Sequence, residues 1–206
     1  MDDLKIRKDR AAGRITLTRP QALNALSHEM ANAVRAALDA WRDDPAVRLV
    51  ILDAEGDKAF CAGGDIAAIY HAAKAGDHTV GQRFFADEYQ MNAAIRDYPK
   101  PIVAFMQGFV MGGGVGLGGH ASHRVVGDTT QVAMPEAGIG MIPDVGGTWL
   151  LARAPGRVGE YLGLTGARMG AADAIHAGFA DLYLPEAEWD AAKDRLAETG
   201  DAAVLT

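Results

Sequence analysis

Residues 101–119, PIVAFMQGFVMGGGVGLGG, change within a few positions from an apolar run to a run of glycines. The apolar residues before Gln107 are typical of a buried strand. Gly112, Gly113 and Gly114 allow a tight turn and the close approach of another backbone or of a ligand. A helix beginning at this turn would direct free backbone N–H groups at whatever lies in front of it. A strand-to-helix turn without a ligand explains the glycines equally well, so this stretch alone does not establish a site.

Residues 59–65, AFCAGGD, have the same composition: small residues follow an apolar strand, and Asp65 is suited to cap a helix that begins at Ile66. An oxyanion hole requires two backbone N–H groups that converge on one point. Two separate glycine turns, each offering one N–H, supply the groups that such a hole needs.

Two carboxylates lie in an apolar, glycine-rich segment, AMPEAGIGMIPDVGGTW, at Glu136 and, eight residues later, at Asp144. Acids that serve solubility have polar neighbours. Two acids in apolar surroundings should instead have pKa values that differ from each other, which suits them to proton transfer. The alternative is structural: Asp144 caps a helix that starts at Val145, and Glu136 is buried with its hydrogen bonds satisfied. The three segments together favour a catalytic site.

The motifs AFCAGGDI, MGGGVGL and MPEAGIGMIPDVGGTWLLAR, with RPQALNALS near the N-terminus, resemble those of the crotonase (enoyl-CoA hydratase/isomerase) superfamily. The resemblance runs from about Leu4 to about Pro185. It implies an α/β fold, a crotonase-like spiral of ββα units that binds acyl-CoA thioesters. It also implies that the backbone N–H groups of Gly64 and Gly113 polarise the thioester carbonyl. The further substrate-binding residues that it implies are Glu88, Ala62, Gly63, Asp65 and Ile66.

Individual positions distinguish the branches of this superfamily. Enoyl-CoA hydratases carry one glutamate just after the Gly-Gly-Gly turn and a second in the Pro-Glu segment; here Gly116 stands at the first position and Glu136 at the second. Hydrolases of the 3-hydroxyisobutyryl-CoA type instead carry Pro-Asp eight residues after the glutamate, where this chain has Asp144. They also carry a glutamate in an FF-x-x-E-Y segment, which FFADEY matches with Glu88. The chain therefore resembles the hydrolase branch.

The resemblance implies thioester hydrolysis of a short 3-hydroxyacyl-CoA, such as 3-hydroxyisobutyryl-CoA in valine breakdown. Glu136 would act as general base on water or attack the carbonyl to give a mixed anhydride. Asp144 would protonate the departing thiolate or order the water, and Glu88 would contact the acyl hydroxyl. Two other functions stay open: an enoyl-CoA hydratase or isomerase, and a non-catalytic acyl-CoA-binding homologue.

Composition narrows the classes of partner. The 206 residues, 49% of them hydrophobic, can bury one core, and the net charge of −7 gives no support for nucleic-acid binding. No apolar run approaches the ~20 residues that span a bilayer, and the chain does not begin with a signal-peptide pattern. We therefore expect no membrane partner and a cytoplasmic location. We also expect no cofactor, because coenzyme A is part of the substrate.

Several single side chains have a structural explanation. Cys61 is the one cysteine and is better explained by packing than as a nucleophile. His120 and His123 lack an acidic or thiol companion at metal-ligand spacing, so we expect no metal. Three basic residues are candidates for contact with the anionic coenzyme A, although each is more simply explained as a solvated surface residue: Lys58, Arg19 and Lys100.

The expected organisation is a crotonase-like acyl-CoA-binding core over residues 1–185 and the start of a C-terminal helical region over residues 186–206. Members of the superfamily continue with helices that cover the acyl-CoA site or build the oligomer. The resemblance thus implies that this region is missing here or lies on another chain. It also implies a homo-oligomer, or association with the missing C-terminal segment.

Local patterns predict the individual elements. A hairpin is expected over 4–10 and 14–18 with its turn at 11–13, and Ser27 is a good N-cap for a helix that ends near Trp41. Further strands are expected at 47–53, 125–126 and 132–133, and further helices at 66–75, 82–97, 145–153, 158–164 and 171–177.

Overall fold

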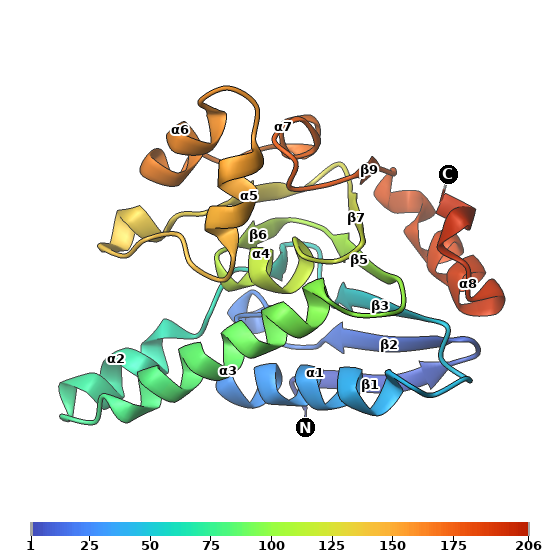
Figure 1. The fold of residues 1–206 in the computed structure, drawn as a ribbon, viewed down its shortest axis with the longest axis horizontal. Helices are drawn as coiled ribbons and strands as arrows, with labels where there is room; N and C mark the ends of the chain where they lie inside the picture. The colour runs from blue at the N-terminus through green and yellow to red at the C-terminus, as the bar shows by residue number, and fades with distance from the viewer. Residues whose placement is uncertain (1, 206) are drawn as a thin grey trace.

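The chain begins with an antiparallel hairpin of β1 (Leu4–Asp9) and β2 (Ala12–Leu17). The computed structural model describes residues 2–205 (Figure 1). The predicted turn at 11–13 is wrong, because the chain reverses at Arg10, which adopts a φ of 53°, and Gly13 already pairs with Lys8 inside the hairpin. Tight two-residue turns require positive φ, and here Arg10 rather than the glycine supplies it.

Two sheets follow, and every strand pair after the hairpin is parallel. The larger sheet has six strands in the order β1-β2-β3-β5-β7-β9, and the smaller has three in the order β4-β6-β8. The remaining strands are β3 (Leu49–Ala54), β4 (Ala59–Cys61), β5 (Ile102–Met106), β6 (Phe109–Met111), β7 (His123–Val126), β8 (Gln131–Ala133) and β9 (Leu182–Tyr183). Each successive pair, β3/β4, β5/β6 and β7/β8, gives one strand to each sheet before the chain turns into helix. This alternation is the predicted spiral of ββα units.

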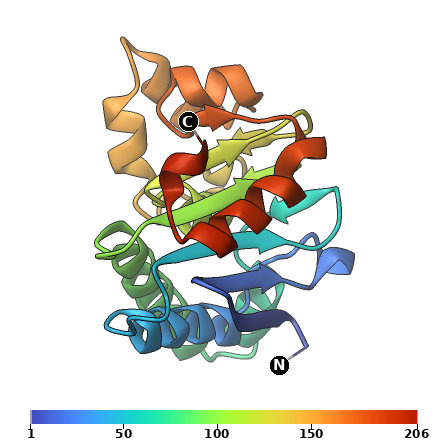
Figure 2. The same ribbon diagram turned by 90° about the vertical axis from the view of Figure 1, so that its right-hand side faces the viewer.

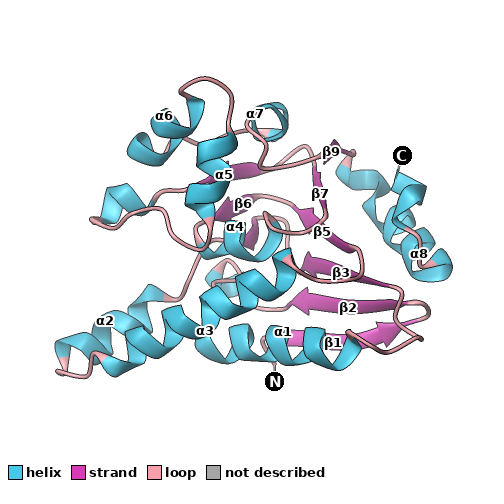
Figure 3. Cartoon of the chain, in the orientation of Figure 1, coloured by secondary structure: helices cyan, strands magenta, loops and turns pink. Residues whose placement is uncertain are grey.

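Helices surround the stacked strands on several sides (Figures 1 and 3). They are α1 (His28–Trp41), α2 (Ile66–Lys74), α3 (Thr79–Arg96), α4 (Gly113–Gly118), α5 (Gly147–Arg153), α6 (Val158–Thr165), α7 (Ala171–His176) and α8 (Trp189–Thr199). Short 3₁₀ turns lie at Pro20–Ala22, Glu136–Ile139, Glu186–Glu188 and Ala202–Leu205.

The larger sheet is covered on both faces. Side chains alternate along a strand, so Val50 and Leu52 of β3 face the core cluster that includes α1 and α3, whereas Leu49 and Ile51 face the opposite side. That opposite side packs against α8, which lies across the sheet in Figure 2. The expected boundary after residue 185 stays a prediction, but the segment that follows it shares a core with the strands.

Most helices begin and end near their predicted positions. Ser27 caps α1 as expected, because its Oγ accepts a hydrogen bond from the Met30 N–H at 3.2 Å. Helix α3 begins three residues before the predicted start at 82, and α5 begins two residues after the predicted start at 145. The expected Asp65 cap is wrong: α2 begins at Ile66, but the Asp65 side chain makes no capping hydrogen bond. Over the described residues, no helix combines the length and the apolar character needed to cross a membrane.

Candidate active site

The strands of the small sheet deliver three loops to one place. Because β4, β6 and β8 are parallel neighbours, the loops that follow them leave from the same edge of the sheet. These loops and α3 enclose a cavity of about 90 Å³. Its lining residues are Ala62, Gly63, Gly64, Ile66, Phe84, Phe85, Glu88, Gly112, Gly113, Pro135, Glu136, Ile139, Met141, Asp144 and Val145.

Two backbone N–H groups are available at this cavity. Leu26 exchanges hydrogen bonds with Gly63 and Asp65, so the N–H of Gly64 between them points away from that bridge. Gly113 is the first residue of α4, where a helical N–H has no partner inside the helix. A Cβ placed on Gly113 would lie 3.0 Å from the Gly64 nitrogen, so the two groups are neighbours. The two glycine turns therefore lie side by side at the cavity, and the oxyanion hole they would form stays a prediction.

Glu88 reaches the cavity from α3 and is 2% exposed. Its Oε1 has no hydrogen-bond partner among the described residues, and a Cβ on Gly113 would lie 2.6 Å from that oxygen. Only glycine at position 113 therefore admits the carboxyl group. Burial, followed by the charges of Asp144 and Glu136, raises the pKa of Glu88 to about 8. The group is mostly protonated at neutral pH.

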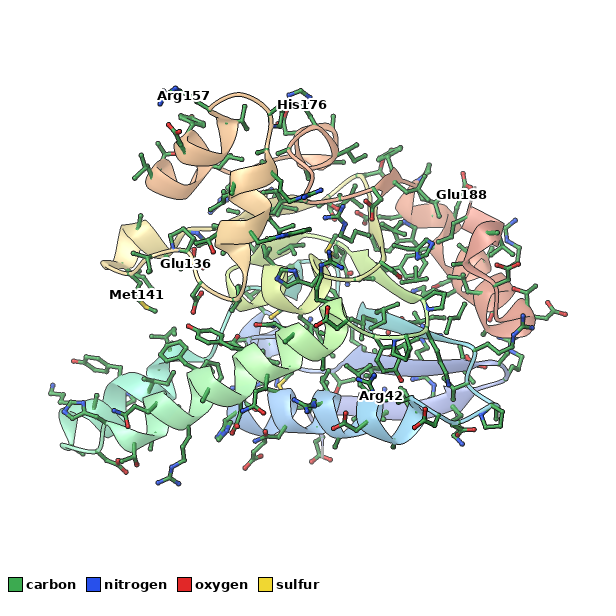
Figure 4. All side chains as sticks on the ribbon, viewed as in Figure 1. Arg42, Glu136, Met141, Arg157, His176 and Glu188 are labelled. Atoms are coloured by element: carbon green, nitrogen blue, oxygen red, sulfur yellow. The ribbon has the colours of Figure 1, made fainter. Side chains whose placement is uncertain are left out.

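Glu136 begins the 3₁₀ turn after β8, on the segment that lies above α2 and α3 in Figure 4. Its Oε2 is buried and, within residues 2–205, without a partner, so the structural alternative of a satisfied Glu136 is wrong. Burial raises the pKa of Glu136 to about 7, opposed by a backbone hydrogen bond and reinforced by the charge of Asp144. A carboxyl group with this pKa can accept or donate a proton at neutral pH.

Asp144 lines the same cavity, and the Tyr89 hydroxyl donates a hydrogen bond to its Oδ2 at 2.7 Å. The structural alternative for Asp144 is also wrong. The N-cap of α5 is Gly146, and the Gly147 N–H donates at 2.6 Å to the backbone carbonyl of Asp144, not to its carboxylate. Its carboxylate therefore does not cap the helix.

The position of Gly116 is closed to any side chain. A Cβ there would lie 2.7 Å from the Cβ of Val145 and 2.8 Å from the Nδ2 of Asn92. Asn92 is buried one helical turn after Glu88, and no described group bonds its amide Nδ2 or Oδ1. The chain therefore lacks a carboxylate at this position and also lacks the space for one.

Some predicted contacts lie elsewhere. Asp65 does not line the cavity, because Nη2 of Arg19 donates to its carboxylate at 2.9 Å. The Lys100 ammonium donates to the backbone carbonyls of Trp41 and Asp44, so it has a structural role. Three basic residues are candidates for contact with coenzyme A. The guanidinium of Arg19 and the ammonium of Lys100 have partners, whereas the ammonium of Lys58 has none in the described part of the chain.

The cysteine and the histidines have structural surroundings. Burial raises the pKa of the Cys61 thiol to about 12, which fits packing and not a nucleophile. His120 is buried, and its Nε2 lies 2.7 Å from the Val145 carbonyl oxygen. Among residues 2–205, no group of three His, Cys, Asp or Glu side chains could hold a metal ion.

Sequence reasoning missed several lining residues and the partner of one acid. Phe84 and Phe85 were quoted only as part of the FFADEY motif, yet both line the cavity. Tyr89 in the same motif had no assigned role, and only the fold shows that it meets Asp144, 55 residues away. A usable signal existed for Asn92, since it lies four residues after Glu88 and thus on the same face of a helix.

A model of the enoyl-CoA hydratase/isomerase family matches residues 12–205. The chain belongs to this family. The match covers every strand after β1 and the eight α-helices of the described residues, so it includes all the residues that line the cavity.

Curated relatives of this family member carry hydrolase names. It is 50% identical over 173 residues to the mitochondrial 3-hydroxyisobutyryl-CoA hydrolase of Xenopus tropicalis, which covers 84% of this chain and 45% of the relative. It is also 43% identical over 171 residues to 3-hydroxyisobutyryl-CoA hydrolase 1 of Arabidopsis thaliana. That alignment covers 83% of this chain and 45% of the relative. The chain spans about half the length of the curated relatives it matches.

Solved structures similar to this family member carry other names. An enoyl-CoA hydratase from Rhodobacter sphaeroides has a TM-score of 0.95 and 62% identity, over 97% of this chain and 59% of that one. A carnitinyl-CoA dehydratase from Mycobacterium thermoresistibile has a TM-score of 0.96 and 50% identity, over 100% of this chain and 60% of that one. The names of the relatives therefore support the family and leave the reaction to be argued from the site.

Proposed function

We propose that this protein hydrolyses the thioester of a short 3-hydroxyacyl-CoA, such as 3-hydroxyisobutyryl-CoA. One observation carries the proposal. A single cavity holds two available N–H groups together with Glu136 and Asp144, while Asn92 and Val145 close the position where a hydratase needs its other acid. A single carboxylate beside an oxyanion hole can drive attack on a thioester, whereas hydration of an enoyl group uses two acids.

In this mechanism the Gly64 and Gly113 N–H groups bind the thioester carbonyl oxygen. They bind it more strongly once the oxygen carries negative charge in the tetrahedral intermediate, which lowers the barrier. Glu136, ionised, either takes a proton from the attacking water or attacks the carbonyl carbon itself to give a mixed anhydride. Asp144 orders the water or protonates the thiolate of coenzyme A as it leaves.

Glu88 supports a substrate with a hydroxyl on its acyl group. Its carboxyl group is buried beside Gly113, and a neutral carboxyl group can both donate and accept a hydrogen bond. The orphaned Oε1 would accept from a hydroxyl in a bound acyl group. An acyl chain without a hydroxyl would leave this buried oxygen unpaired, which lowers its affinity.

A second candidate function is enoyl-CoA hydration or isomerisation. It is favoured by the names of the two solved structures and by Glu136, which alone could move a proton. A non-catalytic acyl-CoA binder is the third candidate. Self-association, or association with a further helical segment, is also a proposal, supported by the sequence resemblance. A cytoplasmic location stays a proposal as well.

Glu136→Gln tests the proposal. The amide keeps the shape of the side chain but removes its basicity, so thiol release from 3-hydroxyisobutyryl-CoA should fall ~10²–10⁴-fold with the fold intact by circular dichroism. Glu160→Gln on α6, whose exposed carboxylate pairs with Arg157, is the matched control and should release thiol normally. Near-normal turnover of Glu136→Gln would exclude Glu136 as base or nucleophile.

A further inference from the structure

The loop that carries Asp144 contains a strained residue. Val145 adopts a φ of 46°, a left-handed conformation that β-branched side chains rarely take. Val145 is also buried, with 2% of its surface exposed, so it is fixed in the core and is not part of a loose surface turn. Backbone strain of this kind persists only where the surrounding structure over-determines it, and such places gather at active sites.

His120 supplies a bond that fixes this residue. Its Nε2 lies 2.7 Å from the Val145 carbonyl oxygen. A carbonyl oxygen can only accept, so Nε2 carries the proton and donates. Burial lowers the pKa of His120, which keeps the ring neutral, and its buried Nδ1 has no partner among the described residues. The tautomer is therefore defined by this one bond.

Tyr89 holds the side chain of the neighbouring residue. Its hydroxyl donates to Oδ2 of Asp144 at 2.7 Å, and burial followed by this hydrogen bond raises the pKa of Tyr89, so the hydroxyl stays a donor. No described group bonds Oδ1 of Asp144, so this oxygen is available for a substrate or a water molecule. A third bond, from the Gly147 N–H to the Asp144 carbonyl at 2.6 Å, joins those from His120 and Tyr89. All three act on the consecutive residues Asp144 and Val145.

We propose that His120 and Tyr89 are positioning residues that together hold Asp144 in the cavity, His120 through the backbone at Val145 and Tyr89 through the carboxylate. Each lies in, or just after, a helix that also contributes to the cavity. Tyr89 follows Glu88 on α3, and His120 comes two residues after α4, which begins at Gly113. The catalytic part of this inference rests on the proposed function, whereas the effect on the loop does not.

The first measurement is independent of activity. Amide hydrogen exchange of Gly147 reports the bond to the Asp144 carbonyl, and it should become at least about tenfold faster in His120→Leu and in Tyr89→Phe. His120→Gln retains an N–H donor of similar reach and should restore slow exchange. His176→Leu on α7, labelled far from Glu136 in Figure 4, and Tyr161→Phe on α6 are the matched controls and should not change it.

The second measurement is thiol release by the same variants. Asp144 acts during the chemical step, so we expect kcat to fall at least about tenfold in His120→Leu and Tyr89→Phe while KM changes less than about threefold. His120→Gln should recover most of kcat. A residue that only stabilised the fold would lower the amount of active protein but would not produce this pattern of loss and rescue.

Each outcome decides the inference. Unchanged Gly147 exchange in both variants would overturn it, as would fast exchange with unchanged kcat. If the unmodified protein releases no thiol, the proposed function fails and the exchange measurement alone decides whether the two residues hold the loop. Tyr89→Phe removes only a hydroxyl from a half-exposed side chain, so it keeps the test valid even if His120→Leu does not fold.

Discussion

Folding buries the carboxyl group of Glu88 beside the acids Asp144 and Glu136, and no cation of residues 2–205 pairs with it. Its folded pKa of about 8 lies well above the 4.5 of a solvent-exposed glutamate. Between these two values the folded protein keeps a proton that the unfolded chain has lost. The free energy of unfolding should therefore fall as pH rises from about 4.5 to about 8 and level off above that range. Glu136, whose pKa is raised to about 7, acts in the same direction.

Glu88→Gln should remove most of this pH dependence, because the amide fills the same space without ionising. At pH 8 we expect the variant to be more stable than the unmodified protein by on the order of 1–3 kcal/mol, and at pH 4.5 to be about equal to it. Urea unfolding at both pH values measures the difference. Glu198→Gln on the exposed side of α8 is the control. The same pH slope in both variants would contradict the raised pKa of Glu88.

At the scale of elements, α4 packs so closely against α3 and Val145 that no side chain fits at Gly116. Gly116→Ala would place a methyl group within 2.7 Å of Val145 and 2.8 Å of Asn92. Such overpacking costs about 1–3 kcal/mol, against a gain of about 1 kcal/mol from helix propensity, so we expect net destabilisation in urea unfolding. In Gly170→Ala the added methyl would meet no atom within 4 Å, so the unfolding free energy should change little. Equal stability of the two variants would show that the Gly116 position can open.

Local signals in the sequence predicted elements well where one residue decides the geometry. Ser27 is such a case, because a hydroxyl before an amphipathic run has one obvious acceptor role, and the α1 cap is confirmed. The hairpin turn was wrong because an arginine took the positive φ that glycine usually supplies. Asp65 has a capping composition, but Arg19, 46 residues away, competes for its carboxylate.

The candidate site was only partly predictable from the sequence. Motif resemblance named Glu136, Asp144, Glu88 and the two glycine turns, and the fold brings all of them to one cavity. The closed position at Gly116 and the bond from Tyr89 to Asp144 depend on how α3 packs. No local pattern carries that information, because packing between distant elements follows from the whole fold.

At the scale of the whole molecule, the spiral explains why residues far apart in sequence serve one site. Each unit adds a strand to the small sheet, and the loop after each strand ends at the same edge. The large sheet, packed between α8 and the helices α1 and α3, supports this arrangement. The chain spans about half the length of the curated relatives that it matches.

The most direct test of the central claim compares two reactions on one preparation. A thiol-trapping assay with 3-hydroxyisobutyryl-CoA and an enoyl absorbance assay with crotonyl-CoA should show thiol release, with hydration at least about a hundredfold slower. Asp144→Gly should lose thiol release without gaining hydration, because Gly116 still supplies no carboxylate. Fast hydration of crotonyl-CoA by the unmodified protein, with no thiol appearing, would contradict the claim that this cavity hydrolyses thioesters.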